Sequence, residues 1–454
     1  MHELDTTLVA VASPPGRGGV GCVRISGNRS EQIARRLFAP SSAGRAPVVG
    51  GRPAFGRFLD RRGRPLDHGY LVLFAGGASY TGEPTAELWP HGSPVVLAEL
   101  VERAVAEGAR PAGPGEFTYR ALFHGRLDLA RAEAVRDLVD ARTRFQARVA
   151  FQQAEGALSC RIDPLRETLI DWIARAEAAV EFVDESETHL ATGPFRRALV
   201  ELRAACDELL RGFDRGRMVR SGATLAVVGL PNAGKSSLFN RLLARERAIV
   251  TEHAGTTRDT LEEDLDLDGI PLRLIDTAGL RQAAHPVESA GVDRARRARA
   301  EADLVLLVLD GSRPLEDDER AALAELAHPP ERERSVAVLN KCDLPEQAEV
   351  AGSILRVSAL TGAGTGALLA ELRRRLVGSA PLEDPVISDV RHATALRAAA
   401  AALGRAAEAD RAGMSEELVL EDLKEALARL GEITGEVHVE ELYDRIFATF
   451  CIGK

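Results

Sequence analysis

The sequence predicts an α/β domain of nucleotide-binding type inserted into a split helical domain, with an N-terminal α+β domain in front. Three observations lead to this prediction. A phosphate-binding loop stands between an apolar strand and a helix at residues 224–243. Ala/Arg/Glu-rich stretches with helical spacing flank that region on both sides, and the first 118 residues mix short β-type runs with many Gly and Pro.

Length and composition bound the number of domains. A chain of 454 residues, 45% of them hydrophobic, is long enough for about three domains with sizeable cores. We expect the N-terminal domain at residues 1–118, the first helical part at 119–218, the α/β domain at 219–379 and the second helical part at 380–454. The α/β domain is expected to contain a mainly parallel sheet.

Local patterns predict the elements of the N-terminal and helical domains. Strand-like apolar runs occupy residues 8–12, 22–25 and 70–74. From residue 117 the pattern becomes helical, and apolar side chains such as Leu165 and Trp172 recur at i, i+4 and i+7 spacing. Helical character resumes after the α/β domain and continues to the end of the chain.

One glycine-rich segment near the N-terminus needs a separate interpretation. Residues 16–21, Gly-Arg-Gly-Gly-Val-Gly, satisfy the G-x-G-x-x-G pattern of dinucleotide-binding folds. The strand-like run 22–26 follows, rather than a helix whose N-terminus would cap a pyrophosphate. We therefore interpret this segment as a structural glycine turn.

Charge and cysteine usage limit the surroundings in which the protein works. No run approaches the ~18 apolar residues of a membrane span, and an acidic start that soon reaches Pro14-Pro15 is unlike a signal peptide. The five cysteines form no C-x-x-C pair and no metal-ligand spacing, which predicts reduced thiols in a cytoplasmic protein. A formal charge of −10 disfavours general nucleic-acid binding, so any RNA contact is expected to be local or supplied by a partner.

The phosphate loop is the most specific pattern in the chain. Residues 229–236, Gly-Leu-Pro-Asn-Ala-Gly-Lys-Ser, match G-x-x-x-x-G-K-[ST]. In a strand-loop-helix context the loop N–H groups face the phosphates, Lys235 reaches the β/γ oxygens, and Ser236 Oγ can bind Mg²⁺. Only four of the 58 basic residues are lysine, and Lys235 and Lys341 are two of them. This favours roles that need a compact ammonium rather than a guanidinium.

Three further motifs predict the base and the mechanism. An apolar run ends in Asp276, a candidate for the Mg²⁺ shell, and the N–H of Gly279 can sense the γ-phosphate. Residues 340–343, Asn-Lys-Cys-Asp, follow another strand, and the Asp343 carboxylate can accept two N–H bonds from guanine that adenine cannot supply. Residues 358–360, Ser-Ala-Leu, fit a loop that supports guanine O6. In this order the motifs specify a GTPase.

The residue after the Asp-Thr-Ala-Gly run carries mechanistic information. Ras-type enzymes place a Gln there to orient the attacking water, whereas this chain has Leu280, which cannot do so. Gln282, His285 and Glu288 are the local candidates for that task.

Together the motifs predict the residues that contact GTP. They are Asn232, Ala233, Gly234, Lys235, Ser236, Ser237, Thr251, Thr256, Thr257, Asp276, Thr277, Ala278, Gly279, Asn340, Lys341, Asp343, Ser358, Ala359 and Leu360.

A monovalent cation is the second mechanistic prediction. Asn232 lies inside the phosphate loop, and a Gly-containing loop at 251–257 stands where the first switch is expected. Loop carbonyls beside an Asn side-chain oxygen can cage K⁺, and K⁺ there would replace an arginine finger. The predicted metal ligands are Ser236 and Thr257 for Mg²⁺, and Asn232, Thr251, His253 and Thr256 for K⁺.

Short segments spread over the whole chain match one known family. They are Pro-Asn in the phosphate loop, Ala-Gly-Thr-Thr-Arg-Asp at 254–259, Asp-Thr-Ala-Gly-Leu at 276–280, Phe-Cys-Ile-Gly-Lys at 450–454, Pro-Pro-Gly-Arg-Gly-Gly-Val-Gly at 14–21 and Pro-Gly-Glu-Phe at 114–117. With them the chain resembles the tRNA modification GTPases MnmE, also called TrmE. The N-terminal segment and the Cys-Ile-Gly-Lys terminus are the most specific to that family.

The resemblance implies chemistry beyond the GTPase. It implies an N-terminal folate-binding domain that dimerises and holds a 5-formyl- or methylene-tetrahydrofolate donor through Arg24, Glu83, Arg126 and Lys454. It also implies a homodimer that acts in a heterotetramer with the FAD- and NADH-dependent partner MnmG (GidA). That complex would install an aminomethyl or carboxymethylaminomethyl group on C5 of the wobble uridine of certain tRNAs.

Roles for individual residues and two alternative functions complete the expectations. By the resemblance Glu288 positions the attacking water, and Lys235 is the other expected catalytic residue. One alternative is a ribosome-assembly GTPase, which predicts a basic RNA-binding appendage that this acidic chain lacks. The other is a free-standing one-carbon transferase with a regulatory GTPase domain.

Cys451 allows three interpretations from the sequence. It could be prenylated, act as a catalytic thiol, or pack on an apolar face near Phe450, and packing is favoured.

Overall fold

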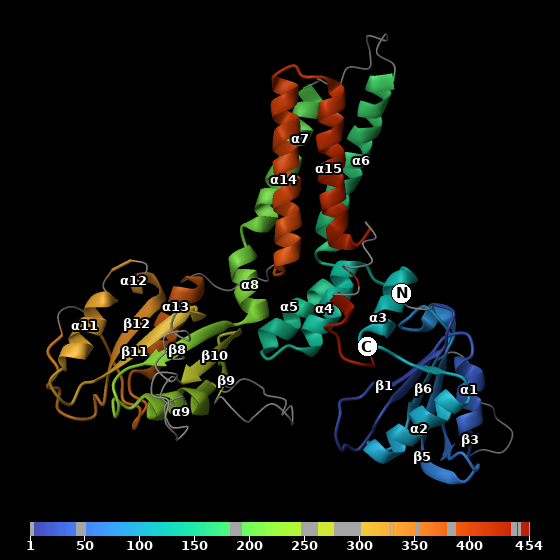
Figure 1. Cartoon of the computed structure of the whole chain (residues 1–454), viewed down its shortest axis with the longest axis horizontal. Helices are drawn as coiled ribbons and strands as arrows, with labels where there is room; N and C mark the ends of the chain where they lie inside the picture. Colours follow the sequence, from blue (N-terminus) through green and yellow to red (C-terminus); the bar gives the residue numbers. More distant parts are fainter. Residues whose placement is uncertain are drawn as a thin grey trace, which may run out of the picture. The chain divides into compact units, whose positions relative to one another are not determined.

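The protein, represented by a computed structural model, divides into two compact units. One combines Met1–Arg136 with Gly431–Lys454, and the other is Asp137–Leu430 (Figure 1). The structure describes residues 4–41, 51–181, 193–246, 262–276, 301–326, 328–329, 331–350, 354–378, 387–436, 443 and 446–453.

A seven-stranded sheet in the order β3-β4-β5-β6-β2-β1-β7 forms the centre of the first unit. Neighbouring strands are antiparallel except β1 and β7, which run parallel. The strands are β1 (Leu8–Val11), β2 (Val23–Ser26), β3 (Phe38–Pro40), β4 (Ala54–Leu59), β5 (Pro65–Phe74), β6 (Thr85–Trp89) and β7 (Arg110–Pro111), with a 3-10 turn at Gly76–Ala78. Strand β2 follows the glycine-rich segment at 16–21, so no helix opens there.

Helices cover the two faces of this sheet unequally. Helices α1 (Ser30–Leu37) and α2 (Pro94–Ala106) place their apolar stripes on one face and build the main core with the strands. On the other face, Phe117 of α3 (Glu116–Phe123) packs near Leu8 of β1. The N-terminal domain is therefore of the α+β class that the sequence predicts.

The end of the chain returns to this unit. An apolar cluster that includes the first residue of α4 (Leu129–Val139) is formed by Leu129, Ala132, Tyr443, Ile446, Phe447 and Phe450. Ile452 then forms a β-bridge with Pro114, and a Cβ on Gly453 would lie 2.2 Å from the carbonyl oxygen of Val11. The expectation that Cys451 is packed is wrong, because the chain leaves the cluster after Phe450 and the next side chain is exposed.

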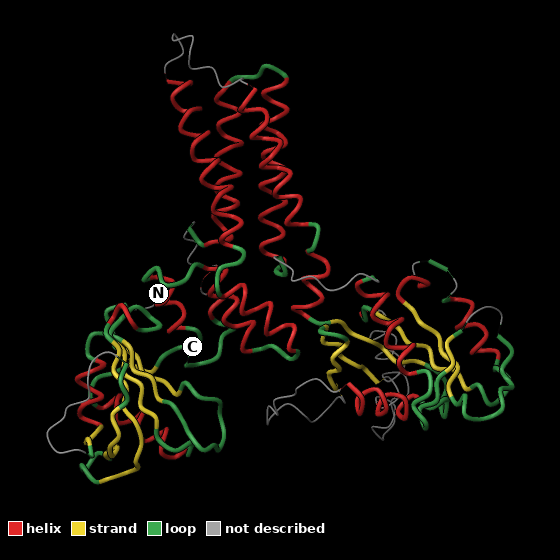
Figure 2. Tube along the Cα trace, turned by 180° about the vertical axis from the view of Figure 1, so that it is seen from behind, coloured by secondary structure: helices red, strands yellow, loops and turns green. Residues whose placement is uncertain are grey.

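Long helices form a bundle in the second unit, where both views show them side by side (Figures 1 and 2). They are α6 (Ser159–Glu181), α7 (Gly193–Leu210), α14 (Val390–Arg411) and α15 (Glu416–Thr434), accompanied by the shorter α5 (Arg144–Ala154) and α8 (Phe213–Ser221). Alanine dominates the buried stripe of α14, which lets α7 approach closely. None of the helices that the structure describes is long and apolar enough to cross a membrane.

The inserted domain contains a six-stranded sheet in the order β13-β12-β11-β8-β10-β9, parallel except for β9. Its strands are β8 (Ala223–Val228), β9 (Glu262–Leu267), β10 (Ile270–Asp276), β11 (Leu304–Asp310), β12 (Ser335–Asn340) and β13 (Leu355–Arg356). Its helices are α9 (Lys235–Glu246), α11 (Asp317–Glu325), α12 (Glu331–Arg334) and α13 (Thr365–Val377). Helices α9 and α13 share one core, and α11 packs into the other. The predicted α/β domain with a mainly parallel sheet is confirmed.

The start of α5 contacts the β9–β10 hairpin. Thr143, the N-cap of α5, donates from Oγ1 to the carbonyl oxygen of Gly269 at 2.8 Å. Gly269 has φ +100°, and a Cβ there would lie 2.7 Å from the Cβ of Phe145, so the close approach requires glycine. Gln146 Nε2 donates to the carbonyl oxygen of Val219 at 2.8 Å. Helical and α/β parts of this unit are thus joined by specific hydrogen bonds.

Candidate nucleotide-binding site

Two glycines shape the phosphate loop, because neighbouring groups leave no room for a side chain at either position. Gly229 has φ +147°, and a Cβ there would lie 2.3 Å from the carbonyl oxygen of Val308. Gly234 has φ +88°, and its Cβ would lie 2.2 Å from Nδ2 of Asn340. Asn232 between them also has a left-handed backbone, with φ 64°, and its side chain is exposed. The loop therefore follows a path that only glycine permits at its two ends.

The groups predicted to meet phosphates gather where α9 begins. Lys235 is 7% exposed, and its Nζ donates to the carbonyl oxygen of Leu230 at 2.8 Å. Ser236 and Ser237 follow it in the first turn and are exposed. Asp276 ends β10, which pairs in parallel with β8, so its backbone lies beside the strand that feeds the loop. An ammonium, two hydroxyls and a helix N-terminus thus share one end of the sheet.

Asn340 connects the phosphate loop to the loop that follows β13. Its Nδ2 donates to the carbonyl oxygen of Ala233 at 2.9 Å, and its Oδ1 accepts from the N–H of Ala359 at 3.0 Å. The residue is 1% exposed, so both hydrogen bonds are shielded from water. A single amide therefore sets the spacing between the predicted phosphate-binding and base-binding segments.

The predicted base-recognition carboxylate is held by a buried serine. Ser358 is fully buried and donates from Oγ to Oδ1 of Asp343 at 2.5 Å, while the same Oγ accepts from the N–H of Thr361 at 3.0 Å. Asp343 itself is exposed. The side chain of Leu360 is 74% exposed, so this residue is placed to contribute its backbone rather than its side chain.

Two residues of this region escaped the sequence analysis. Arg241 of α9 donates from Nε to the carbonyl oxygen of Ala359 at 2.9 Å, and from Nη2 to that of Leu360. Asp310 ends β11 and accepts a hydrogen bond from Lys341 Nζ at 2.6 Å. Burial alone would raise the pKa of the Asp310 carboxyl, but hydrogen bonds from Lys341 and Ser312 outweigh burial and hold that pKa below its usual range.

Several predicted site residues lie outside the residues that the structure describes. They are Thr251, His253, Thr256, Thr257, Thr277, Ala278, Gly279, Leu280, Gln282, His285, Glu288 and Lys454. The K⁺ ligands including Asn232, the Mg²⁺ ligands Ser236 and Thr257, and the choice of the water-positioning residue therefore stay predictions.

The described part of the site fits GTP. Three loops meet at the carboxyl ends of β8, β12 and β13, the edge at which α/β sheets bind nucleotides. A Cβ at Gly234 would fill the space inside the phosphate loop, and Lys235 brings a buried positive charge to the same loop. Asp343 presents an exposed carboxylate at the other end of the site, where the base is expected. A triphosphate and a guanine base would meet complementary groups along this edge.

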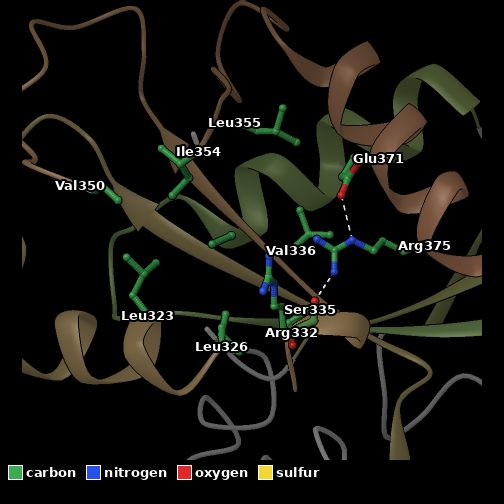
Figure 3. A pocket seen from close by; sticks show the side chains of 11 residues that line it. Leu323, Leu326, Arg332, Ser335, Val336, Val350, Ile354, Leu355, Glu371 and Arg375 are labelled. Atoms are coloured by element: carbon green, nitrogen blue, oxygen red, sulfur yellow. Dashed lines mark hydrogen bonds and ion pairs between the residues drawn. The ribbon is translucent and has the colours of Figure 1, made fainter. Parts of the chain in front are cut away.

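A separate hollow lies at the opposite end of β12. It has a volume of about 370 Å³, and its apolar side is built from α11, the end of β12 where Ser335 lies, and β13 (Figure 3). At its mouth Arg375 is bound to Glu371 at 2.8 Å and to the carbonyl oxygen of Arg332, so its guanidinium is already engaged. Because β12 starts here and ends at Asn340, this hollow is no part of the nucleotide site.

Arg24, predicted to contact folate, lies on the sheet of the first unit. Its Nε and Nη2 bind Oε1 of Glu87 on the neighbouring strand at 3.0 and 2.9 Å. Its guanidinium carbon lies 5.7 Å from the ring centres of both Tyr80 and Phe117. The side chain is 20% exposed, so it is oriented by an ion pair and two aromatic rings while still reaching the surface.

Glu83, a second predicted folate contact, belongs to a buried hydrogen-bond network. Both of its carboxylate oxygens lie 2.9 Å from Nη1 of Arg120, and Oε2 accepts from Ser26 Oγ at 2.8 Å. Arg120 is fully buried in α3 and was missed, although a lone Arg in the apolar run Phe-Thr-Tyr-Arg-Ala-Leu-Phe is a visible anomaly. Arg126 is exposed and packs its stem near Gly82, so three predicted residues gather around residues 80–87.

Strand order, phosphate loop and the loops at 340–343 and 358–360 together define a GTPase of the P-loop class. A family model described as "MnmE helical domain" matches residues 129–451, and one described as "GTP-binding protein TrmE N-terminus" matches residues 7–126. The chain belongs to the family of the tRNA modification GTPase MnmE.

Curated relatives match along the whole chain. The chain is 41% identical to the tRNA modification GTPase MnmE of Koribacter versatilis, over 100% of both sequences. It is 43% identical to the same-named protein of an Azoarcus species over 98% of each sequence, and 40% identical to that of Aquifex aeolicus over 98% of this chain and 99% of the relative. The protein is a GTP hydrolase involved in tRNA modification.

Proposed function

We propose that this GTPase binds GTP with its phosphates on residues 233–237 and its guanine between Asp343 and the loop at 358–360. The observation that carries the proposal is the double hydrogen bond of Asn340, which joins those two segments. Lys235 would meet the β/γ oxygens, and Asp343 would accept the N1 and N2 hydrogens of guanine. Adenine would leave that carboxylate unpaired, which disfavours ATP.

Metal ions supply charge neutralisation and a template for the triphosphate when they are bound. Ser236 and Thr257 are the proposed Mg²⁺ ligands, with Asp276 in the surrounding shell. Asn232, Thr251, His253 and Thr256 are the proposed K⁺ ligands. The exposed, left-handed Asn232 supports this assignment, because its side chain stands free of the core at the rim of the phosphate loop.

Glu288 is the proposed positioning group for the attacking water. Leu280 offers no hydrogen-bonding group at the place where Ras-type enzymes carry Gln. A carboxylate can accept a proton from the attacking water, directly or through a bridging water. It thereby turns the lone pair of that water toward the γ-phosphate. Lys235 would stabilise the charge that develops on the phosphate oxygens during the same step.

The base chemistry rests on family membership. The relatives are named tRNA modification GTPases, and we propose that this chain acts on C5 of the wobble uridine of certain tRNAs together with the FAD-dependent MnmG. The added carbon would come from a formyl- or methylene-tetrahydrofolate. A homodimer, a heterotetramer with MnmG and a cytoplasmic location complete the proposal.

The buried Cys22 of the N-terminal domain is not proposed to take part in this chemistry. Burial raises the pKa of its thiol to about 12, so the thiol stays protonated and unreactive.

Folate is proposed to bind the N-terminal domain through Arg24, Glu83, Arg126 and Lys454. The gathering of the first three around residues 80–87 supports this assignment. A guanidinium flanked by two aromatic rings suits an anionic, ring-bearing ligand. We retain residues 1–118, 119–218, 219–379 and 380–454 as the proposed domain boundaries.

The experiment that tests the proposed function is mass analysis of wobble nucleosides from a strain that lacks this chain. Loss of the C5-modified uridines, and their return with the wild-type gene, is the expected result. A gene carrying Lys235→Ala should fail to restore them, because phosphate binding would be lost. An unchanged nucleoside profile in the deletion strain would contradict the proposal.

A further inference from the structure

An ion pair beside the base-recognition loop involves a residue that none of the nucleotide-binding motifs contains. Asp310 is the last residue of β11 and lies opposite Asn340 in the parallel pairing with β12. Its Oδ2 accepts a hydrogen bond from Lys341 Nζ at 2.6 Å. The Asp310 side chain is 8% exposed, whereas the Lys341 side chain is 32% exposed. The pair is therefore anchored at its buried, acidic end.

Asp310 is itself fixed by its own turn. Its Oδ1 accepts from the N–H of Ser312 at 2.9 Å and from Ser312 Oγ at 2.6 Å. Arg313 is the next cation, with Nε 3.9 Å from Oδ2 of Asp310, but its two terminal nitrogens each bind Glu319 at 3.0 Å. Among the described residues, Lys341 is thus the cation that hydrogen-bonds this carboxylate, while the terminal nitrogens of Arg313 are held by Glu319.

Lys341 has a backbone conformation that needs support. Its φ is 66°, in the left-handed region that a residue with a Cβ disfavours. This turn lets Asn340 face the phosphate loop while Asp343 reaches Ser358, and the N–H of Leu344 closes it on the carbonyl oxygen of Lys341 at 2.9 Å. A tether on the Lys341 side chain therefore stabilises the geometry of both neighbouring recognition residues.

Charge explains why the tether must be an ion pair. A buried carboxylate at the nucleotide end of the sheet would repel an incoming triphosphate unless a cation neutralised it. Lys341 supplies that cation at 2.6 Å. Its ammonium is consequently engaged with the protein, and only its aliphatic stem is left to face a bound base.

We propose that Asp310 is a positioning residue for guanine recognition, which acts by holding Lys341 and thereby the 340–343 loop. The inference rests on the proposed guanine site at Asp343. The Lys341 ammonium then binds Asp310 rather than the phosphates. The base pocket is supported by the end of β11 in addition to β12 and the 358–360 loop.

The test is a double-mutant cycle in the full-length protein. Asp310→Asn, Lys341→Met and the double variant are assayed for the KM and kcat of GTP hydrolysis and for GDP dissociation with a fluorescent analogue. Each single variant should raise KM about tenfold and leave kcat within about twofold, as expected for a lost charge-assisted hydrogen bond that orients binding. The double variant should be no worse than Lys341→Met alone, because Asp310 acts through Lys341.

Two further variants separate this role from a general folding defect. Asp303, the residue before β11 begins, accepts from the N–H and Oγ1 of Thr224 at 2.9 Å each. Asp303→Asn makes the same change at the far end of the strand and should leave KM unchanged. Asp310→Glu keeps the charge on a longer stem and should recover part of the lost affinity. Thermal unfolding by circular dichroism is followed for every variant.

The outcomes distinguish the inference from the proposal on which it rests. If Lys341→Met raises KM and Asp310→Asn does not, or if their effects add in the double variant, the positioning role is overturned while the guanine site stands. If Lys341→Met and Asp343→Ala both leave KM unchanged, the guanine site itself is overturned, and the inference falls with it.

Discussion

A buried cluster of three charges offers the most quantitative test of the packing in the second unit. Arg220, one residue before the end of α8, lies between Asp137 and Asp389, and all three side chains are 15–17% exposed. Its Nε and Nη2 bind Asp137 at 2.5 and 3.1 Å, and its Nη1 binds Asp389. Burial alone would lower the pKa of Arg220, but the two carboxylates raise it above its usual range.

The expected cost of removing this guanidinium follows from its burial. Arg220→Ala removes the guanidinium that both carboxylates share while they stay largely shielded from water, and the loss of such a charged partner costs about 3–5 kcal/mol. At roughly 2–4 °C per kcal/mol for a domain of this size, the Tm of the second unit should fall by about 10 °C. Asp389 also caps α14 through the N–H of Arg391 at 2.7 Å, so fraying of that helix should accompany the loss.

The assay is calorimetric and circular-dichroism melting of the full chain, with a matched control. Arg211 pairs with Glu208 at 2.6 Å, but the two side chains are 73% and 68% exposed. Arg211→Ala should therefore change stability by less than about 1 kcal/mol. Equal effects of the two substitutions would refute the argument from burial. Replacing Asp137 and Asp389 with Asn in the Arg220→Ala background should restore most of the stability, because the two carboxylates that Arg220 paired are then replaced by neutral amides.

Four further outcomes are expected. Gly234→Ala places a methyl group 2.2 Å from Asn340 Nδ2, and should weaken GDP binding at least about tenfold by calorimetry without loss of helix content; unchanged affinity would contradict the cradle. GTP hydrolysis should be faster in K⁺ than in Na⁺ at equal ionic strength, and Asn232→Ala should abolish most of the difference; equal rates in both salts for the wild type would exclude K⁺ activation. Glu288→Ala should lower kcat by roughly 10² or more with little change in nucleotide affinity, whereas a silent Glu288→Ala and an inactive Gln282→Ala would show that the water is placed by Gln282. Deleting residues 451–454 should abolish binding of 5-formyl-tetrahydrofolate and preserve GTP hydrolysis; retained folate affinity would show that Lys454 does not contact the folate.

The elements of the α/β domain were predictable because their signals are local. An apolar strand, a glycine loop and a helix stand next to each other around Lys235, and strand-type runs precede Asp276 and Asn340. The glycines at 229 and 234 follow from the same motif, although only the structure shows that Val308 and Asn340 exclude a side chain there.

Residues that meet the motifs through tertiary register could not be found in this way. Asp310 lies 31 residues before Lys341, and only the parallel pairing of β11 with β12 brings their side chains together. Arg241 reaches the 358–360 loop because α9 turns one face toward it, which no spacing in the sequence reveals. Cys451 was misjudged for the converse reason. The preceding Phe450 is apolar and buried, but Cys451 and Ile452 lie beyond the apolar cluster and are exposed.

The nucleotide specificity of Asp343→Asn tests the central claim most directly. Initial rates of GTP, ATP and xanthosine triphosphate hydrolysis are measured for the wild type and the variant in the full-length protein. The wild type should prefer GTP, and the variant should lose roughly hundredfold or more in kcat/KM for GTP, because an amide cannot accept both guanine N–H bonds. The variant should gain hydrolysis of xanthosine triphosphate, because the xanthine base offers a carbonyl oxygen to the new amide N–H. A variant that hydrolyses GTP like the wild type, or a wild type that accepts ATP equally well, would contradict the assignment of Asp343 to guanine recognition.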